Sequence, residues 1–325
     1  MRRRNFIFAL GSSLAVPAPF LVRAQPAIAT VGIVSPASPT PNAGEPFLRS
    51  MKEQGWEDGR NCRVIVRYAE GHFERFPKLI DELVAQRVNV LVLFSDPAIQ
   101  AAQRATMTIP IVATANDMIT GGLATSMAKP GGNLTGINVL AHALDVKRLE
   151  FLHEAVAGAR RIGTLADGRM PSGQAELDAA ARHLNFDLVL ATPRSPEELI
   201  TSLETLVSAH IDAVNVLDSP MIFAMRTNII KRLNRARLPA IYAWPETVKL
   251  GGLLAYGASV KDQLQQIARL VSKILKGTRP QDLPIEQPDR YELTVNIKTA
   301  KTIGLALPPS ILARADEVIE GGSAP

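Results

Sequence analysis

The stretch Arg87–Ile99, RVNVLVLFSDPAI, decides the fold class, and His210–Ile222, HIDAVNVLDSPMI, repeats its pattern. Each is a short apolar run that ends in a serine/aspartate pair and a proline. A continuous Val/Leu run bounded by turn residues is typical of a parallel strand buried on both faces. Asp96 or Ser219 can cap the helix that follows, with the proline at its first position, where no N–H is needed. Two such strand–cap–helix units far apart in one chain predict two similar lobes.

The elements around these two stretches follow the same order, β-α-β-α-β-α-β, in both halves of the chain. The first series runs from the strand Ile28–Val34 to the strand Ile109–Thr114, and the second from Ile162–Ala166 to Pro239–Ala243. Strands and helices that alternate at this spacing predict parallel sheets with helices on both faces. The expected fold class is therefore α/β, with two similar doubly wound parallel-sheet lobes.

The last part of the chain is predicted to join the two lobes through a hinge of three crossovers. A helix over Lys261–Leu275 is expected to return to the first lobe, and a strand over Arg290–Ile297 to the second. Lobe 1 is then predicted to comprise residues 25–140 and 258–289, and lobe 2 residues 141–257 and 290–325.

Residues 1–24 have the pattern of a secretory signal peptide, cleaved near Ala24. A charged start precedes an apolar run, and Arg3–Ile7 resembles a twin-arginine export signal. The segment also accounts for most of the net charge of +5, because the remainder carries 32 basic and 31 acidic residues. The charge balance therefore indicates no nucleic-acid partner, and the signal predicts a periplasmic protein.

Patterns typical of catalysis or metal binding are hard to find in this sequence. The five histidines have no metal-ligand spacing, and no Gly-x-Ser-x-Gly turn, phosphate-binding loop or dinucleotide-binding fingerprint is present. Cys62 is the only cysteine, so it cannot form an intrachain disulfide. The sequence predicts a protein that is not an enzyme and that uses no metal or cofactor.

Polar and aromatic side chains gather instead where the predicted strands end, which is the edge where open parallel sheets bind ligands. If the two edges face each other, they enclose one ligand-binding cleft. Helix N-termini after Asp96 and Ser219 would suit a ligand carboxylate, the acids an ammonium, and the aromatic rings a flat or apolar body. Several of these residues could equally be helix caps, turn residues or lobe packing. The predicted ligand-binding residues are Ser35, Ser95, Asp96, Asn116 and Asp117 in lobe 1, Asp167, Asp218, Ser219, Tyr242, Trp244 and Glu246 in lobe 2, and Tyr256 near the hinge.

Several motifs resemble those of ABC-importer substrate-binding proteins, in the type I periplasmic-binding family that includes tryptophan- and tyrosine-binding proteins. The resemblance covers essentially the whole mature chain, and it departs from the family where Ser95-Asp96-Pro97 replaces a Gly-Thr-Pro-like turn. The motifs that carry it are residues 55–61 (GWEDGRN), 129–136 (KPGGNLTG), 148–150 (RLE), 238–242 (LPAIY), 251–253 (GGL) and 282–288 (DLPIEQP).

The resemblance implies a periplasmic, monomeric receptor that closes two lobes on a small solute and delivers it to a membrane permease with its ATPase. The expected solute is amino-acid-like or another small, possibly aromatic, carboxylate. A periplasmic sensor for a signalling partner is the alternative. A hydrolase is a third class, without a supporting constellation of residues.

Overall fold

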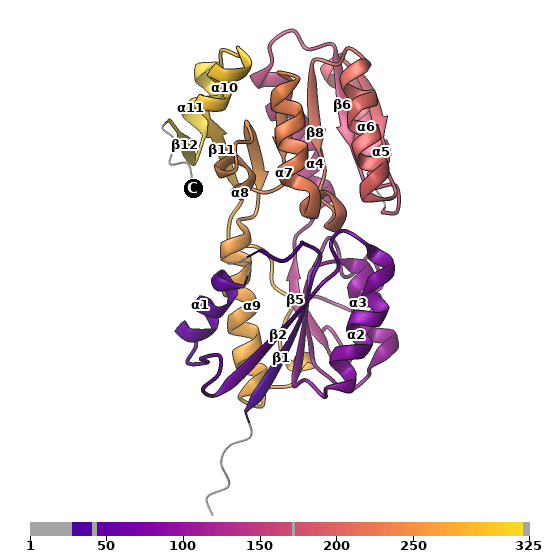
Figure 1. Cartoon of the computed structure of the whole chain (residues 1–325), viewed down its shortest axis with the longest axis vertical. Coiled ribbons are helices and arrows are strands. Elements are labelled where there is room, and N and C mark those ends of the chain that lie inside the picture. The colour runs from indigo at the N-terminus through magenta and orange to yellow at the C-terminus, as the bar shows by residue number, and fades with distance from the viewer. Residues whose placement is uncertain (1–27, 41–43, 171–172, 321–325) are drawn as a thin grey trace, which may run out of the picture.

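The computed structural model describes residues 28–40, 44–170 and 173–320. The predicted signal peptide, residues 1–24, and its cleavage point near Ala24 lie outside the described residues. Within the described part of the chain, no helix is long and apolar enough to cross a membrane. The described residues form two α/β lobes stacked along the long axis of the molecule, with lobe 1 at the bottom of Figure 1 and lobe 2 at the top.

Lobe 1 is built on an all-parallel sheet with the strand order β2-β1-β3-β4-β5. Helices α2 and α3 cover one face of this sheet, and α9 and α1 cover the other (Figure 1). Its strands and helices are β1 (Ala29–Ser35), α1 (Glu45–Glu53), β2 (Cys62–Tyr68), the 3₁₀ turn η1 (Phe73–Arg75), α2 (Phe76–Ala85), β3 (Val90–Leu93), α3 (Asp96–Ala105), β4 (Ile111–Ala115), β5 (Leu134–Asn138), α9 (Val260–Leu275) and the 3₁₀ turn η2 (Pro280–Asp282).

Lobe 2 has the sheet order β12-β11-β10-β9-β8-β6-β7, with β11 antiparallel to β10 and the other pairs parallel. Its elements are α4 (Ala141–Ala155), β6 (Arg161–Leu165), α5 (Gln174–Leu184), β7 (Asp187–Ala191), α6 (Pro196–Ser208), β8 (Ala213–Val216), α7 (Pro220–Arg235), β9 (Ala240–Tyr242), α8 (Glu246–Lys249), β10 (Leu254–Gly257), β11 (Glu292–Asn296), α10 (Ile297–Ile303), α11 (Pro309–Arg314) and β12 (Glu317–Ile319). The two-lobe α/β prediction is confirmed, while the short elements α8 and β12 had no sequence signal.

The two stretches that predicted the lobes form β3 and β8, each with neighbours on both sides in its sheet. All four residues of each strand are buried, as expected for parallel strands covered on both faces. The capping prediction is confirmed for Ser219, whose Oγ accepts a hydrogen bond from Ile222 N at 3.0 Å. It is wrong for Asp96: Ser95 caps α3, and Asp96 is the first helical residue.

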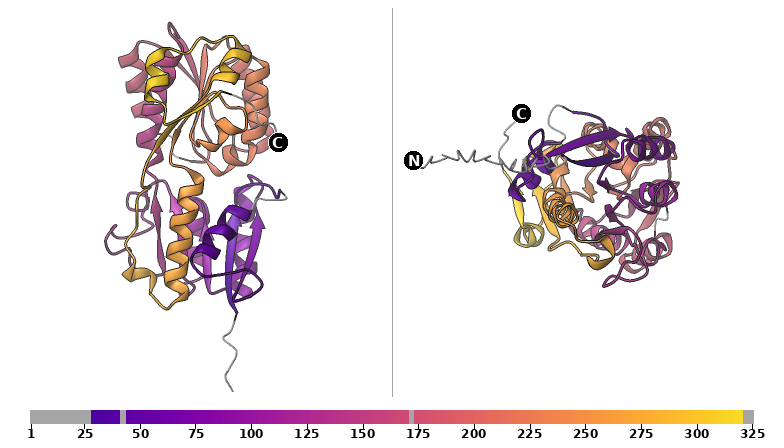
Figure 2. Two further views of the ribbon diagram at one scale, coloured as in Figure 1. Left: turned by 90° about the vertical axis from the view of Figure 1, so that its left-hand side faces the viewer. Right: turned by 90° about the horizontal axis from the view of Figure 1, so that it is seen from below.

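The chain passes between the lobes three times, which confirms the predicted hinge. It leaves lobe 1 after β5 to begin α4, returns after β10 to begin α9, and leaves again after η2 to begin β11. Helix α9 packs on α1 and on strands β3, β4 and β5, so it belongs to lobe 1 although it follows a strand of lobe 2. Figure 2 shows the connecting segments together on one side of the molecule.

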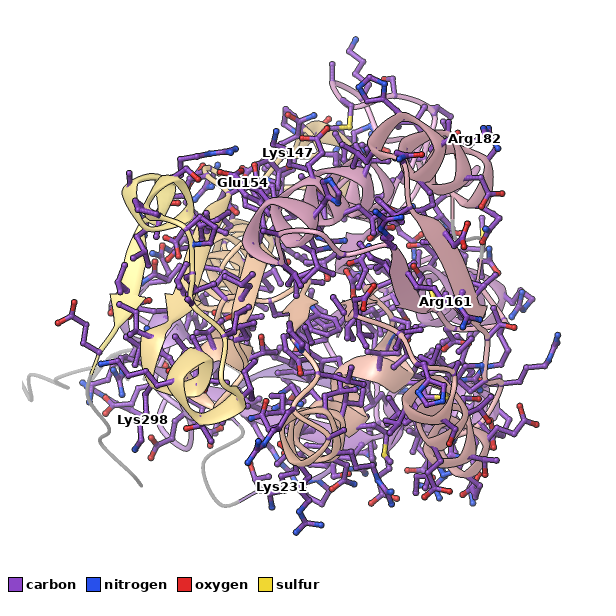
Figure 3. The ribbon with its side chains drawn as sticks, turned by 90° about the horizontal axis from the view of Figure 1, so that it is seen from above. Lys147, Glu154, Arg161, Arg182, Lys231 and Lys298 are labelled. Carbon is purple, nitrogen blue, oxygen red and sulfur yellow. The ribbon has the colours of Figure 1, made fainter. Side chains whose placement is uncertain are left out.

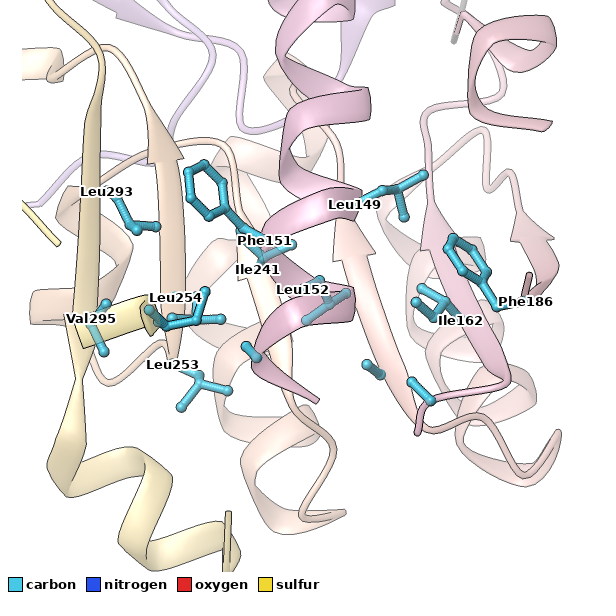
Figure 4. Packing of buried hydrophobic residues seen from close by; sticks show 14 of the residues in the cluster. Leu149, Phe151, Leu152, Ile162, Phe186, Ile241, Leu253, Leu254, Leu293 and Val295 are labelled. Carbon is cyan, nitrogen blue, oxygen red and sulfur yellow. The ribbon is translucent and has the colours of Figure 1, made fainter. Parts of the chain in front are cut away.

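Each lobe has its own hydrophobic core on both faces of its sheet. In lobe 2, α4 lies across the middle of the sheet and buries Leu149 and Leu152 against Ile162 and Ile241 (Figure 4).

The strands that precede two of the crossovers, β5 and β10, each require a glycine. A Cβ at Gly136 would overlap the carbonyl oxygen of Ala113, and one at Gly257 that of Ala243. The backbones therefore approach closely just before the chain leaves each lobe.

Candidate functional site

The carboxyl ends of both sheets face the junction between the lobes. The chain runs from the carboxyl end of β5 directly into lobe 2, and from the carboxyl end of β10 directly into lobe 1. Because the neighbouring strands are parallel to these two, their carboxyl ends point to the same junction (Figure 1). Open parallel sheets bind ligands at this edge. The predicted residues that follow β1, β3, β4, β6, β8 and β9 are thus brought to one interlobe junction.

On the lobe 1 side, hydrogen bonds join the ends of β3 and β4. Ser95 is buried, and its Oγ accepts a hydrogen bond from Ala98 N at 3.4 Å. The Asp96 carboxylate accepts a hydrogen bond from Asn116 N at 3.1 Å. Asp96 and Asn116 therefore form part of one fixed edge, with both side chains half-buried.

Asp117 lies at the same edge but serves its own turn. Its Oδ1 accepts hydrogen bonds from Ile119 N at 3.0 Å and from Asn138 Nδ2 at 3.4 Å. Partial burial opposes ionisation of this carboxyl, but the hydrogen bonds from Thr120, Ile119 and Asn138 outweigh it and lower its pKa. Asp117 therefore favours its charged form and uses Oδ1 to hold its own turn. Ser35 is similar, since its Oγ accepts a hydrogen bond from Ala37 N at 3.2 Å.

On the lobe 2 side, the ends of β6 and β8 carry Asp167, Asp218 and Ser219. Ser219 is buried as a helix cap, and Asp218 beside it is half-buried. The Asp167 side chain is fully buried and forms an ion pair with Arg169. Asp167 Oδ1 accepts from Arg169 Nε at 3.1 Å, and Oδ2 accepts from Arg169 Nη2 at 3.2 Å. This two-pronged contact holds the guanidinium in one orientation.

Arg169 extends from lobe 2 to lobe 1. Its guanidinium carbon lies 3.8 Å from the centre of the Phe73 ring, and Nη2 donates to the Gly71 carbonyl oxygen at 3.4 Å. Glu74 adds a long ion pair, with 3.9 Å between Arg169 Nη1 and Glu74 Oε2. We call Arg169 with these partners and Asp167 the Arg169 bridge. It binds the loop after β2 of lobe 1 to the loop after β6 of lobe 2.

The Arg169 bridge lies on the opposite side of the junction from the hinge. In lobe 1, β2 and the hinge strand β5 are the two edges of the sheet, and in lobe 2, β6 is separated from the hinge strand β10 by β8 and β9. The backbone at Gly71 also comes close to Pro196 and Met221, at the starts of α6 and α7. The lobes are therefore in contact both at the hinge and at the far side, which is a closed arrangement.

Between these two contacts, lobe 2 presents an aromatic and charged group of side chains. Trp244, at the end of β9, is 7% exposed and belongs to the core of lobe 2, where it lies edge-on to the half-buried Phe223 of α7, with 5.1 Å between the ring centroids. The Arg226 guanidinium stacks on Phe223, 4.1 Å from the centre of its ring. Glu246 follows at the start of α8, where Oε1 accepts from Lys261 N at 3.2 Å. We call Phe223, Arg226, Trp244 and Glu246 the lobe 2 wall.

Tyr242 and Tyr256 are not brought to this wall. Tyr242 is 1% exposed, its ring packs beside Gly252 in the core of lobe 2, and burial raises the pKa of its hydroxyl. Tyr256 packs on Phe151 of α4, with 4.9 Å between the ring centroids, beside the hinge. The prediction that Tyr242 contacts ligand is at odds with its place in the core, because β9 directs alternate side chains to opposite faces of the sheet.

Comparison with known proteins identifies the family to which the chain belongs. The model of the ABC transporter substrate binding protein family matches residues 29–319, which includes both lobes and the hinge. The chain belongs to this family. A tyrosine-binding protein of Clostridioides difficile (strain R20291) is 25% identical to it over 263 residues, which are 80% of this chain and 75% of the relative.

Two solved structures share the fold of this substrate-binding protein. A conserved domain protein from Vibrio cholerae superposes with a TM-score of 0.79 and 24% identity, over 90% of this chain and 99% of that one. An ABC domain in complex with L-Trp from Streptococcus pneumonia superposes with a TM-score of 0.77 and 21% identity, over the same shares of the two chains. The type I periplasmic-binding architecture predicted from the sequence is confirmed.

Four residues that shape the junction of this substrate-binding protein were missed from the sequence: Gly71, Phe73, Arg169 and Arg226. Arg169 follows Asp167 by two positions, a local signal that could have suggested their ion pair. Phe73 had no such signal, because its contact with Arg169 joins residues far apart in the sequence. The same holds for Arg226, on which the charge of Glu246 acts.

Other surface features lie apart from the junction. Two open depressions of about 370 and 490 Å³ lie beside α1 and beside α6, and neither is lined by a predicted site residue. At the end of lobe 2 farthest from lobe 1, exposed basic side chains such as Arg182 and Lys231 point outward around the rim (Figure 3). In the described residues, no group of three or more His, Cys, Asp or Glu side chains could hold a metal ion.

Proposed function

We propose that this protein is the solute receptor of an ABC importer, and that it closes its two lobes on an amino-acid-like ligand with an aromatic side chain. The closed junction carries this proposal: the Arg169 bridge joins the lobes on the side away from the hinge. Binding energy that depends on contacts from both lobes favours the closed form over the open one.

The ligand class is supported by the chemistry of the junction and by the relatives. Phe223, packed against the buried Trp244, offers aromatic surface, while Asp96, Asp218 and Glu246 place carboxylates at the junction, where one of them can accept an ammonium group. A relative is named a tyrosine-binding protein, and a protein of the same fold was solved with L-Trp. An aromatic amino acid meets all of these requirements, with a charged head and a flat apolar body.

In this proposal the receptor acts as a monomer in the periplasm, where residues 1–24 direct it before cleavage near Ala24. The closed form then docks on a membrane permease, whose ATPase drives transport. The receptor makes and breaks no covalent bond and needs no metal or cofactor.

Thermal unfolding with a panel of L-amino acids and aromatic acids tests the ligand class. A ligand present at about 100 times its Kd stabilises the folded state by about 2.7 kcal/mol, equivalent to a rise in Tm of roughly 4 °C for a protein of this size. We expect such a rise with L-tryptophan, L-tyrosine or L-phenylalanine. An unchanged Tm across the panel would contradict the ligand class, and uptake by vesicles containing the permease would test transport as opposed to sensing.

A further inference from the structure

The lobe 2 wall contains a cation without a matching anion. Arg226 is half-buried, stacks on Phe223 and donates one hydrogen bond, from Nη1 to the Phe223 carbonyl oxygen at 2.5 Å. Glu246 is the acid whose charge acts on it, yet among the described residues no carboxylate oxygen lies within 4.0 Å of the guanidinium. Burial lowers the pKa of Arg226, and the charge of Glu246 offsets this only in part. The guanidinium has five N–H donors, and those without a protein acceptor remain accessible to solvent, where a ligand carboxylate can replace water.

The same wall contains a carboxylate oxygen without a donor. Glu246 Oε1 accepts hydrogen bonds from Lys261 N at 3.2 Å and Ser259 Oγ at 3.4 Å, at the start of α9. Glu246 Oε2 is buried and has no hydrogen-bond partner in the described structure. Burial raises the pKa of this carboxyl. A donor that arrives with a ligand would satisfy this oxygen.

The helix N-termini at the junction are poorly equipped to bind a carboxylate. In α3, Pro97 has no N–H, and the Ala98 N–H is taken by Ser95. In α7, Pro220 has no N–H, and the Ile222 N–H is taken by Ser219. Each helix therefore retains at most one donor N–H in its first three positions. This weakens the prediction that they bind the ligand carboxylate.

We propose that Arg226 binds the α-carboxylate of the ligand and that Glu246 Oε2 accepts a hydrogen bond from its α-ammonium group. Phe223, supported from behind by the buried Trp244, then contacts the aromatic side chain of the ligand, beside the head group that these two charges hold. Helical side chains lean toward the N-terminus of their helix, which for α7 is the junction, so Arg226 is directed toward the ligand. This inference rests on the proposed function and assigns residues to the two charges of its ligand.

A cycle of protein and ligand changes tests the assignment. We would measure Kd by calorimetry for L-tryptophan, tryptamine (no carboxylate) and 3-(indol-3-yl)propionate (no ammonium), with the wild type, Arg226→Gln and Glu246→Gln. Arg226→Gln should weaken L-tryptophan about 10–100-fold but change tryptamine less than about 3-fold, as expected when a charged hydrogen-bonded pair is lost. Glu246→Gln should weaken L-tryptophan and tryptamine but leave 3-(indol-3-yl)propionate nearly unchanged.

Matched controls come from a surface ion pair that uses the same helix. Arg232 of α7 pairs with Glu204 at 3.0 Å, so Arg232→Gln and Glu204→Gln should leave all three affinities unchanged. If Arg226→Gln fails to fold, Arg226→Lys keeps a charge and should still lose affinity only for ligands with a carboxylate.

The outcomes separate this inference from the proposed function. A wild type that binds none of the aromatic amino acids contradicts both. A wild type that binds L-tryptophan while Arg226→Gln and Glu246→Gln behave like the controls retains the function and overturns the assignment. Equal losses for all three ligands would also overturn it, because they would indicate a structural role for these side chains.

Discussion

Phe73→Leu is expected to weaken closure of the two lobes without unfolding either of them. The Phe73 ring is the lobe 1 surface on which the Arg169 guanidinium stacks, at 3.8 Å from the ring centre. Leucine keeps an apolar side chain in the loop but removes the aromatic face. Replacing Arg169 itself would be less informative. It would leave the fully buried Asp167 carboxylate without its cation, at a cost of about 3–5 kcal/mol to folding.

The size of the effect follows from the burial of Arg169. Its side chain is 17% exposed, so the cation–π contact should contribute about 1–2 kcal/mol, toward the upper end for such pairs. The hydrogen bond to Gly71 and the exposed pair with Glu74 remain in the variant. A loss of about 1–2 kcal/mol lowers the ratio of closed to open molecules by roughly 5–30-fold. If the ligand-free protein is mostly open, Kd should rise by that factor; if it is mostly closed, the open population should rise instead.

Small-angle X-ray scattering measures the open population through the radius of gyration, and calorimetry measures Kd. We expect a larger radius of gyration without ligand, a higher Kd, or both, with the ligand-saturated radius unchanged. Arg314→Gln is a matched control, because Arg314 stacks on Phe151 at 4.5 Å within lobe 2 and does not cross the junction. A folded Phe73→Leu protein with the radius and Kd of the wild type would refute the role of the Arg169 bridge in closure.

Three further predictions concern single residues. Burial raises the pKa of Glu246 above its usual 4.5. The contribution of this carboxyl to stability is therefore present below about pH 4.5 and is lost as the pH rises through its folded-state pKa. Glu246→Gln should raise the ligand-free Tm at pH 7, and this gain should vanish near pH 4. Ser219→Ala removes a cap with a 3.0 Å hydrogen bond and should lower the free energy of unfolding by about 1 kcal/mol in urea, more than Ser95→Ala, where the bond is 3.4 Å; equal losses would contradict this ranking. Burial, followed by the charge of Asp58, raises the pKa of the buried Cys62 thiol, so a disulfide reagent should modify it slowly in the native protein and rapidly in urea.

Local chemistry made much of the architecture predictable. The runs that became β3 and β8 are apolar without interruption, a pattern that reports burial on both faces whatever the neighbours are. Ser219 could be identified as a cap because a serine before a proline satisfies a helix N–H three residues on. At Ser95 and Asp96 two neighbours could do this, and the prediction that Asp96 is the cap was wrong; the cap is the residue with extended backbone, which is Ser95.

The junction between the lobes was much less predictable. The residues that end the strands could be placed at one edge because parallel strands share a direction, but their partners could not. Asp117 turned out to serve its own turn, and Tyr242 the core of lobe 2. The strand β11 was predicted, but its antiparallel direction was not, since strand direction depends on the path of the chain through the hinge.

The sequence by itself determined the repeated order of strands and helices and most helix starts, because these depend on residues close together in the chain. The two-lobe α/β fold and the crossovers followed from that order. Only the tertiary structure decided that Arg169 reaches Phe73, 96 positions earlier in the chain, and that the charge of Glu246 acts on Arg226. Side-chain periodicity predicts which face of a helix or strand is apolar, but not which element packs against that face. The contacts between the lobes depend on how the two folded lobes are oriented about the hinge.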